Sequence, residues 1–129
     1  MIIDTSALVA VHEGEDDGVQ FLERMRREPD LKMSAGSLLE SSIVLDARQP
    51  ARTSRRLDRL LADLNIRVVP VDGEHVRVAR AAYRDFGRGS GHPAGLNFGD
   101  CFAYALATIT GEPLLFKGDD FARTDVRRA

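Results

Sequence analysis

Short apolar runs alternate along the chain with longer segments of helical periodicity, and this alternation limits the possible folds most strongly. Four runs are predicted strands: residues 2–4, 31–35, 66–71 and 113–117. Because these runs are short and mostly apolar at successive positions, both faces of the sheet must be buried. Strands alternating with helices favour a parallel sheet covered on both sides. We therefore predict an α/β fold with three layers, in which a short, mostly parallel sheet is flanked by helices.

The segments between these runs are predicted helices. They cover residues 5–15, 16–30, 36–49, 51–65, 72–87 and 97–111. Thr5 or Ser6 is the expected N-cap of the first helix, and Asp72 that of the fifth. Pro29 is expected to end the second helix and Pro50 the third. The remaining segment, residues 118–126, is predicted to be a turn followed by an irregular tail.

The last predicted helix is unusually apolar, with the sequence LNFGDCFAYALA over residues 96–107. We expect Phe98, Phe102 and Tyr104 to lie in the core. Asp100 is the one carboxylate in this run, and a buried carboxylate is costly unless it is capped, paired or bound to a cation. Its presence near the start of the helix therefore needs an explanation.

The chain length of 129 residues suits a single domain over residues 1–129. The glycine-rich loop at 87–95 is too short and too close to the end to divide two domains. Pro70 predicts that the strand at 66–71 lies at an edge of the sheet or ends there, because proline lacks a backbone donor.

Composition excludes several classes of protein. The formal net charge of −2 implies no strong attraction to a polyanion or a polycation. One cysteine, Cys101, rules out an intrachain disulfide or a thiolate zinc cluster. No apolar run approaches the ~18 residues of a membrane span, and the N-terminus lacks the features of a signal peptide. We therefore expect a cytoplasmic protein with no membrane partner.

Five carboxylates are placed where such a fold builds its ligand sites. Asp4 ends the first strand, Glu40 lies in the helix after the second, and Asp100 lies in the first turn of the last helix. Asp119 and Asp120 follow the fourth strand directly. Strand ends and the starts of the following helices share one edge of a parallel sheet. We expect these side chains to meet in one crevice there.

Each carboxylate alone has a structural explanation, as a helix cap, a partner of the helix dipole or a turn former. Together these explanations weaken, because like charges ~4 Å apart repel by about 1 kcal/mol in water and more in a crevice. A divalent cation removes that repulsion. Oxygen ligands without a histidine cluster favour Mg²⁺ or Mn²⁺, and such a site supports metal-assisted phosphoryl transfer.

Four motifs carry a resemblance to a known family: MIIDTSALVA, SLLESSIV, LNFGDCFAYALA and LLFKGDDFARTD. In this order and over essentially the whole chain they resemble the PIN-domain ribonucleases, and within them the VapC-type toxins of toxin–antitoxin pairs. The resemblance implies a PIN-like fold and a Mg²⁺- or Mn²⁺-dependent endoribonuclease with RNA as substrate. It also implies neutralisation by a cognate antitoxin and a homodimer.

The resemblance also assigns roles to individual residues. Asp4, Glu40 and Asp100 match the family's three main acidic positions and are the expected catalytic residues, with Asp120 as the fourth. The expected metal ligands are Asp4, Asp100 and Asp120, with Asp119 as a close second to Asp120. The polar residues expected beside the ligands or the substrate are Thr5, Ser6, Asn97 and Thr124.

Two other functions fit part of the pattern. A non-catalytic PIN-like binding module would share the fold and could use the same crevice. A receiver-type phosphoacceptor domain would also combine an α/β fold, an acidic Mg²⁺ pocket and a late lysine, for which Lys117 is a candidate. A receiver needs an acceptor aspartate after its third strand, where Asp72 is the only choice and serves as a helix cap.

Overall fold

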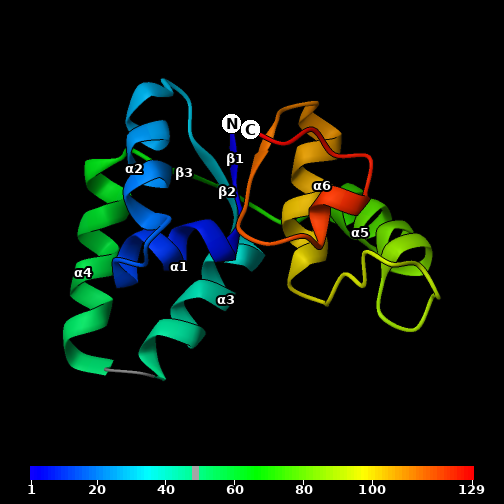
Figure 1. The fold of residues 1–129 in the computed structure, drawn as a ribbon, viewed down its shortest axis with the longest axis horizontal. Helices are drawn as coiled ribbons and strands as arrows, with labels where there is room; N and C mark the ends of the chain where they lie inside the picture. Colours follow the sequence, from blue (N-terminus) through cyan, green and yellow to red (C-terminus); the bar gives the residue numbers. More distant parts are fainter. Residues whose placement is uncertain (48–49) are drawn as a thin grey trace.

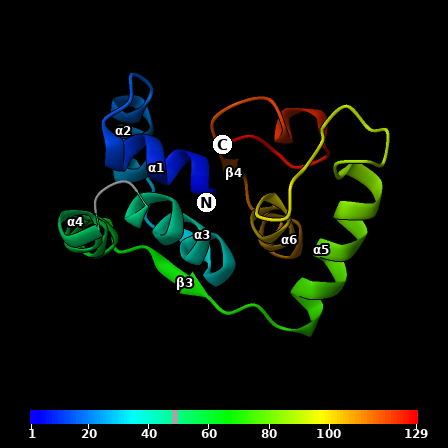
Figure 2. The same ribbon diagram turned by 90° about the horizontal axis from the view of Figure 1, so that it is seen from below.

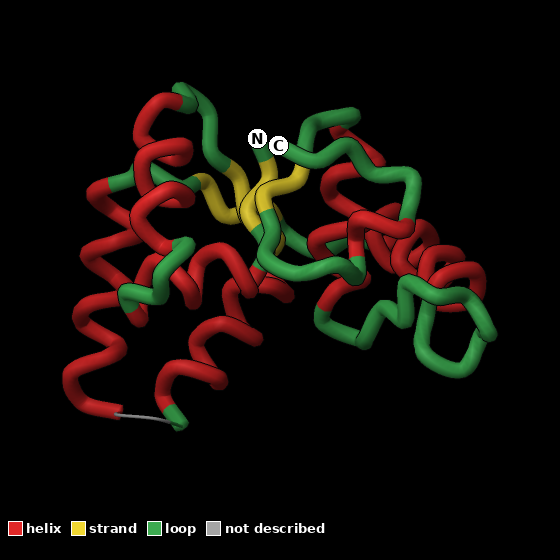
Figure 3. The backbone as a smooth tube through the Cα atoms, viewed as in Figure 1, coloured by secondary structure: helices red, strands yellow, loops and turns green. Residues whose placement is uncertain are grey.

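In the computed structural model, which describes residues 1–47 and 50–129, four strands form one parallel sheet in the order β3-β2-β1-β4. The strands are drawn in yellow in Figure 3. The strands are β1 (Ile2–Ile3), β2 (Lys32–Ser34), β3 (Arg67–Val69) and β4 (Leu114–Leu115). Ile2 pairs with Leu114 and Ile3 with Leu115, in parallel register. This register brings the carboxyl ends of β1 and β4 together, although more than 100 residues separate them in the sequence.

Helices cover both faces of the sheet (Figures 1 and 2). One side carries α1 (Thr5–Glu13), α2 (Gly18–Arg27), α3 (Ala35–Asp46) and α4 (Pro50–Asp63), and the other carries α5 (Gly73–Phe86) and α6 (Asp100–Thr110). The predicted three-layer α/β architecture is confirmed. Among the residues that the structure describes, no helix has the length and apolar character needed to cross a membrane.

Successive strand residues face opposite cores, because side chains alternate along a strand. Ile3 and Leu115 pack with α1 to α4, whereas Ile2, Leu114 and Phe116 pack with α5 and α6. All five of these side chains are at most 3% exposed. Burial on both sides explains why β1 and β4 are apolar throughout. β2 also carries Lys32 and Ser34, and the edge strand β3 is largely exposed and begins with Arg67.

Several helix ends differ from their predicted positions. Asp4, not Thr5 or Ser6, caps α1, because its carboxylate accepts the backbone N–H of Ser6. Helix α3 ends at Asp46, and Pro50 begins α4 instead of ending the helix before it. Proline is well suited to the first turn of a helix, where its missing N–H has no intrahelical partner. The predicted end of α3 at residue 49 lies outside the described residues.

The edges of the sheet agree with the prediction for β3 and add a feature at β4. β3 lies at one edge, and Pro70 follows directly after it. At the other edge the C-terminal tail runs beside β4, where Ala129 donates its N–H to the carbonyl of Leu114 at 2.9 Å. Residues 121–123 form a short 3₁₀ turn, η1 (Phe121–Arg123), within the segment predicted to be irregular.

One aromatic residue is placed differently from the prediction. Tyr104 is buried in the core between α5 and α6, as expected, and Phe102 is partly buried. Phe98 is 77% exposed, because it precedes α6 in the connecting turn instead of lying on its buried face. Its ring stands edge-on to Phe102, with 5.0 Å between the ring centroids.

Candidate active site

A pocket of about 280 Å³ opens at the carboxyl edge of the sheet. It lies where the ends of β1 and β4 meet the starts of α1, α3 and α6, as expected for a parallel α/β fold. Its lining residues are Asp4, Thr5, Ser6, Val9, Glu40, Val44, Asn97, Asp100, Lys117, Asp120 and Phe121. Four of the five predicted carboxylates and three of the four predicted polar residues therefore surround one space.

Asp4 is the most deeply buried of these carboxylates, at 3% exposure. Its Oδ2 accepts hydrogen bonds from the backbone N–H of Ser6 at 2.9 Å and from the Ser6 hydroxyl at 2.6 Å. Its Oδ1 is buried and has no hydrogen-bond partner. Burial raises the pKa of Asp4, the two Ser6 hydrogen bonds oppose this rise, and the negative charge of Glu40 adds to it.

The end of β4 fixes the orientation of Ser6. The backbone N–H of Lys117 donates to Ser6 Oγ at 2.9 Å, so the single hydroxyl proton of Ser6 is directed to Asp4. This link between residues 111 apart was not predicted from the sequence, because it follows from the pairing of β1 with β4. The Lys117 ammonium group reaches back to Glu15 at 2.8 Å and Asp17 at 3.2 Å.

Glu40 projects from the second turn of α3 toward α1. Thr5 donates its hydroxyl proton to Glu40 Oε2 at 2.7 Å, and the Ser37 carbonyl, at 3.1 Å, is the more distant acceptor for the same proton. Bonds to a charged acceptor are shorter and stronger than neutral ones. Thr5 therefore holds one oxygen of this carboxylate in place.

Asp100, the carboxylate that interrupts the apolar run, exchanges two hydrogen bonds with Asn97 at the start of α6. The backbone N–H of Asn97 donates to Asp100 Oδ2 at 2.7 Å, and the N–H of Asp100 donates to Asn97 Oδ1 at 3.0 Å. Burial raises the pKa of Asp100 to about 7. The Asn97 hydrogen bond opposes that rise, whereas the negative charges of Asp4, Asp120 and Glu40 add to it.

The two acidic residues after β4 differ in position. Both side chains are exposed, but Asp120 lines the pocket and Asp119 is not among the lining residues. Thr124, predicted near the site, ends the η1 turn instead: its hydroxyl donates to the Phe121 carbonyl at 2.8 Å and accepts from the Val126 N–H at 3.4 Å. Thr124 is not a lining residue either.

The donor set of this pocket fits a hard divalent cation. Asp4 Oδ1 is a buried acceptor that lacks a donor, and the other carboxylates raise the pKa of Asp100 by repulsion. Within residues 1–47 and 50–129, no three histidine, cysteine, aspartate or glutamate side chains form a group that could hold a metal ion as they stand. The carboxylates surround the pocket, and a cation of this chemistry would have to draw them inward.

Comparison with known proteins agrees with this architecture. The chain belongs to the PIN domain family, which it matches over residues 1–127. It is 52% identical over 129 residues to ribonuclease VapC42 of Mycobacterium tuberculosis, covering 100% of this chain and 98% of that protein. It is 51% identical over 129 residues to ribonuclease VapC28 of the same species, covering 100% and 97%. Within the PIN domains the chain is thus of the VapC type, and the predicted resemblance to VapC ribonucleases is confirmed.

Solved structures show the same fold at low identity. VapC20 of M. tuberculosis, described as a sarcin–ricin loop cleaving toxin, superposes with a TM-score of 0.78 at 17% identity, over 99% of this chain and 97% of that one. VapBC2 of Rickettsia felis, bound to a DNA fragment from its promoter, superposes with a TM-score of 0.75 at 13% identity, over 98% of this chain and 94% of that one. A PIN fold is not a receiver fold, so the receiver-type alternative is set aside.

Proposed function

We propose that this chain is a Mg²⁺- or Mn²⁺-dependent endoribonuclease that acts as the toxin of a toxin–antitoxin pair. The observation that carries the proposal is the pocket at the carboxyl edge of the sheet, which four carboxylates line and in which Asp4 Oδ1 is buried without a donor. The curated relatives, named VapC ribonucleases, support RNA as the substrate.

Asp4, Asp100 and Asp120 would hold the cation from three different parts of the chain. When bound, Mg²⁺ or Mn²⁺ supplies positive charge at the phosphate and lowers the pKa of water. Asp4 offers Oδ1 because Ser6 occupies its other oxygen, and Asp100 is likewise bonded through one oxygen, to Asn97. These hydrogen bonds orient the ligands before the cation arrives.

Glu40 has a separate role in this proposal. With Thr5 holding one oxygen, its carboxylate orients the attacking water and accepts a proton from it. The water attacks phosphorus in line, the bond from phosphorus to one ribose oxygen breaks, and that oxygen takes up a proton from solvent water. Lys117 lines the same pocket, and its ammonium group would reach a substrate phosphate only by leaving Glu15 and Asp17.

The proposal includes two protein partners. A structural neighbour from Klebsiella pneumoniae is a toxin–antitoxin complex, which supports a cognate antitoxin for this chain. Exposed apolar side chains support a homodimer. Among them are Leu39 and Ile43 on α3, Val76 and Tyr83 on α5, and Phe98 before α6. Light scattering on the purified chain, alone and co-expressed with its antitoxin, measures both assemblies.

Metal removal tests the proposed reaction. The purified chain, free of antitoxin, is incubated with a total-RNA pool in Mg²⁺ or Mn²⁺, in EDTA, and after the cation is restored. We expect discrete products that disappear in EDTA and return with the cation, because the carboxylates cannot neutralise the phosphate themselves. A folded, metal-loaded chain that leaves RNA intact would favour the non-catalytic binding module.

A matched pair of variants tests the fourth ligand. Asp120→Asn is expected to weaken Mn²⁺ binding at least about tenfold, because it removes a charge that lines the pocket. Asp119→Asn removes the same charge from the neighbouring residue, which does not line the pocket, and should leave Mn²⁺ affinity and cleavage unchanged. Calorimetric titration measures the Mn²⁺ affinity of both variants. If Asp119→Asn weakens Mn²⁺ binding and Asp120→Asn does not, Asp119 is the ligand.

A further inference from the structure

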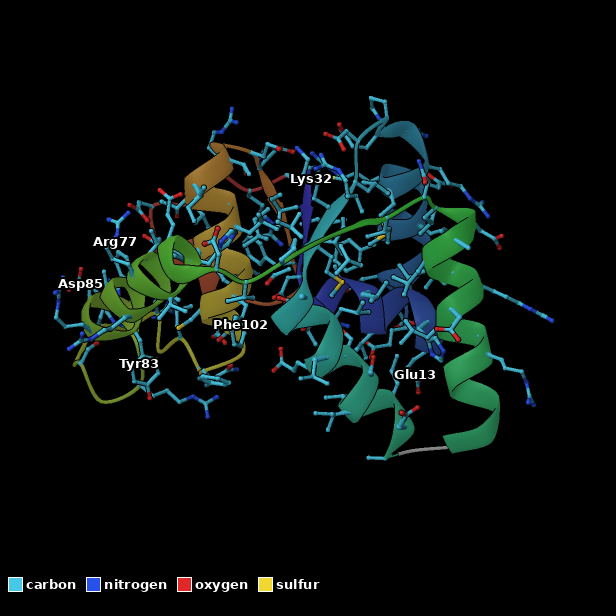
Figure 4. The ribbon with its side chains drawn as sticks, turned by 180° about the vertical axis from the view of Figure 1, so that it is seen from behind. Glu13, Lys32, Arg77, Tyr83, Asp85 and Phe102 are labelled. Atoms are coloured by element: carbon cyan, nitrogen blue, oxygen red, sulfur yellow. The ribbon has the colours of Figure 1, made fainter. Side chains whose placement is uncertain are left out.

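Helices α3 and α6 contact each other through two reciprocal close contacts. Gly36 on α3 lies against the ring of Phe102 on α6: a Cβ at Gly36 would be 2.5 Å from ring carbons of Phe102. Gly99, directly before α6, lies against Glu40 of α3: a Cβ there would be 2.0 Å from Glu40 Oε1. Phe102 is labelled on α6 in Figure 4, near the start of α3. Each helix thus supplies one glycine and one side chain that fills the space beside it.

Both contacts lie in one interface between α3 and α6, as the spacing of the four residues shows. Gly36 and Glu40 are four residues apart on α3 and therefore share a face of that helix. Gly99 and Phe102 are three residues apart at the start of α6. The two contacts together set how far α3 can slide along α6, and they hold the Glu40 carboxylate beside the residue that precedes Asp100.

The backbone does not require glycine at residue 99. Its φ of −63° and ψ of −41° lie in the right-handed helical region that every residue can adopt. Gly99 is buried, and all three of the nearest atoms to an added Cβ belong to the Glu40 carboxyl group. The need for glycine therefore comes from the contact with Glu40 and not from a turn.

We propose that Gly99 is a positioning residue for Glu40: its missing side chain leaves the space in which the carboxylate lies, while Thr5 holds the carboxylate from the opposite helix. This inference rests on the proposed function of Glu40 in RNA cleavage. A methyl group at residue 99 displaces the carboxylate and breaks its hydrogen bond to Thr5.

Gly99→Ala tests this role, with Gly73→Ala as its matched control. Gly73 is the first residue of α5, and a Cβ there meets no atom within 4 Å. We expect Gly99→Ala to lower kcat about 10²-fold, since a displacement of about 1 Å has effects of that size. KM for RNA should change less than about twofold, because Glu40 acts on the water and not on substrate binding. Gly73→Ala should match the wild type in both.

Variants of Glu40 separate positioning from a general structural effect. Glu40→Asp shortens the side chain and alone should lower kcat, but in the Gly99→Ala background it should raise kcat because the shorter side chain clears the methyl group. Unfolding by denaturant supplies a readout without activity. The stability losses from Gly99→Ala and Glu40→Ala should be less than additive, since both break the same Thr5 contact.

Specific outcomes would overturn the inference. The inference is wrong if the kcat and KM of Gly99→Ala equal those of Gly73→Ala. It is also wrong if the losses of stability caused by Gly99→Ala and Glu40→Ala add up exactly in the double variant. If Gly99→Ala alone does not fold, the double variant with Glu40→Ala should fold as Glu40→Ala does, and failure to do so places the clash elsewhere. A wild-type chain that does not cleave RNA removes the proposed function, while the stability comparison still decides whether Gly99 positions Glu40.

Discussion

Replacing Asp4 by asparagine is expected to abolish RNA cleavage while leaving the chain folded. The asparagine carbonyl oxygen can take the place of Oδ2 and keep the hydrogen bonds from Ser6, so the cap of α1 survives. Its amide nitrogen then takes the place of Oδ1, the buried oxygen without a partner. A ligand oxygen is thereby replaced by a donor, and we expect the cleavage rate to fall at least about 10²–10³-fold.

The same substitution should also remove stabilisation by the cation. A ligand that binds only the folded state stabilises it by about 2.7 kcal/mol when present at about 100 times its Kd. Mn²⁺ should therefore raise the unfolding temperature of the wild type and leave that of Asp4→Asn nearly unchanged. Without the cation, Asp4→Asn should be at least as stable as the wild type, because burial penalises the ionised carboxylate.

Asp72→Asn is the matched control for this prediction. Asp72 caps α5 as Asp4 caps α1, and it accepts from the backbone N–H groups of Glu74 and His75, both at 3.0 Å. Asparagine is an equally good N-cap, and Asp72 is not among the pocket residues. Cleavage by Asp72→Asn should match the wild type. Retained cleavage in Asp4→Asn would show that Asp4 is only a helix cap.

The second large effect concerns pH. The pKa of Asp100 is about 7 in the folded chain without a cation, against an ordinary value of 3.8. The folded state therefore binds this proton more tightly than the unfolded state does. Stability contributed by protonated Asp100 is fully present below about pH 4 and is lost as the pH rises to about 7. The contribution of Asp100 to the stability of the cation-free chain should accordingly decrease from about pH 4 to about pH 7.

Cation binding should show the opposite dependence, because a carboxylate must lose its proton to become a ligand. Affinity for Mn²⁺ is expected to rise by up to about tenfold per pH unit below pH 7 and to level off above it. Stabilisation by Mn²⁺ should grow over the same range. Titration calorimetry and thermal unfolding at several pH values between about 5 and 8 measure both.

Asp100→Asn identifies the residue responsible. This variant keeps an acceptor for the Asn97 N–H and so retains the start of α6, but it has no proton to lose. Its weakened Mn²⁺ affinity should no longer rise through pH 7. An undiminished rise in Asp100→Asn would assign the titration to Asp4, whose pKa is also raised by burial.

Local signals were enough to predict much of this molecule. Among the described residues, short and mostly apolar runs located the strands, and capping residues, prolines and helical periodicity located the helices, because all of these signals depend on neighbours within a few positions. Errors arose at the helix ends. Residues 4–6 contain three possible N-caps, and Pro50 can either follow a helix or begin one, so nearby sequence does not choose between these positions.

The fold class, and the edge of the sheet where the acidic residues gather, follow from the order of residues along the chain. Asp4 follows a strand, Asp100 begins a helix, and in a parallel sheet such positions lie at the same edge. The family follows as well, because the motifs around these residues lie in order along the chain. These conclusions needed only periodicity and the order of elements.

Tertiary structure alone decided which atoms are available in the pocket. Asp4 has one free oxygen because β4 pairs with β1 and so brings the N–H of Lys117 to Ser6. Asp120 lines the pocket while its neighbour Asp119 does not. Gly99 lies against Glu40 because α3 crosses α6 there. Each of these arrangements involves residues far apart in the chain. Their positions in space are set by the packing of whole helices and strands, which no local sequence pattern records.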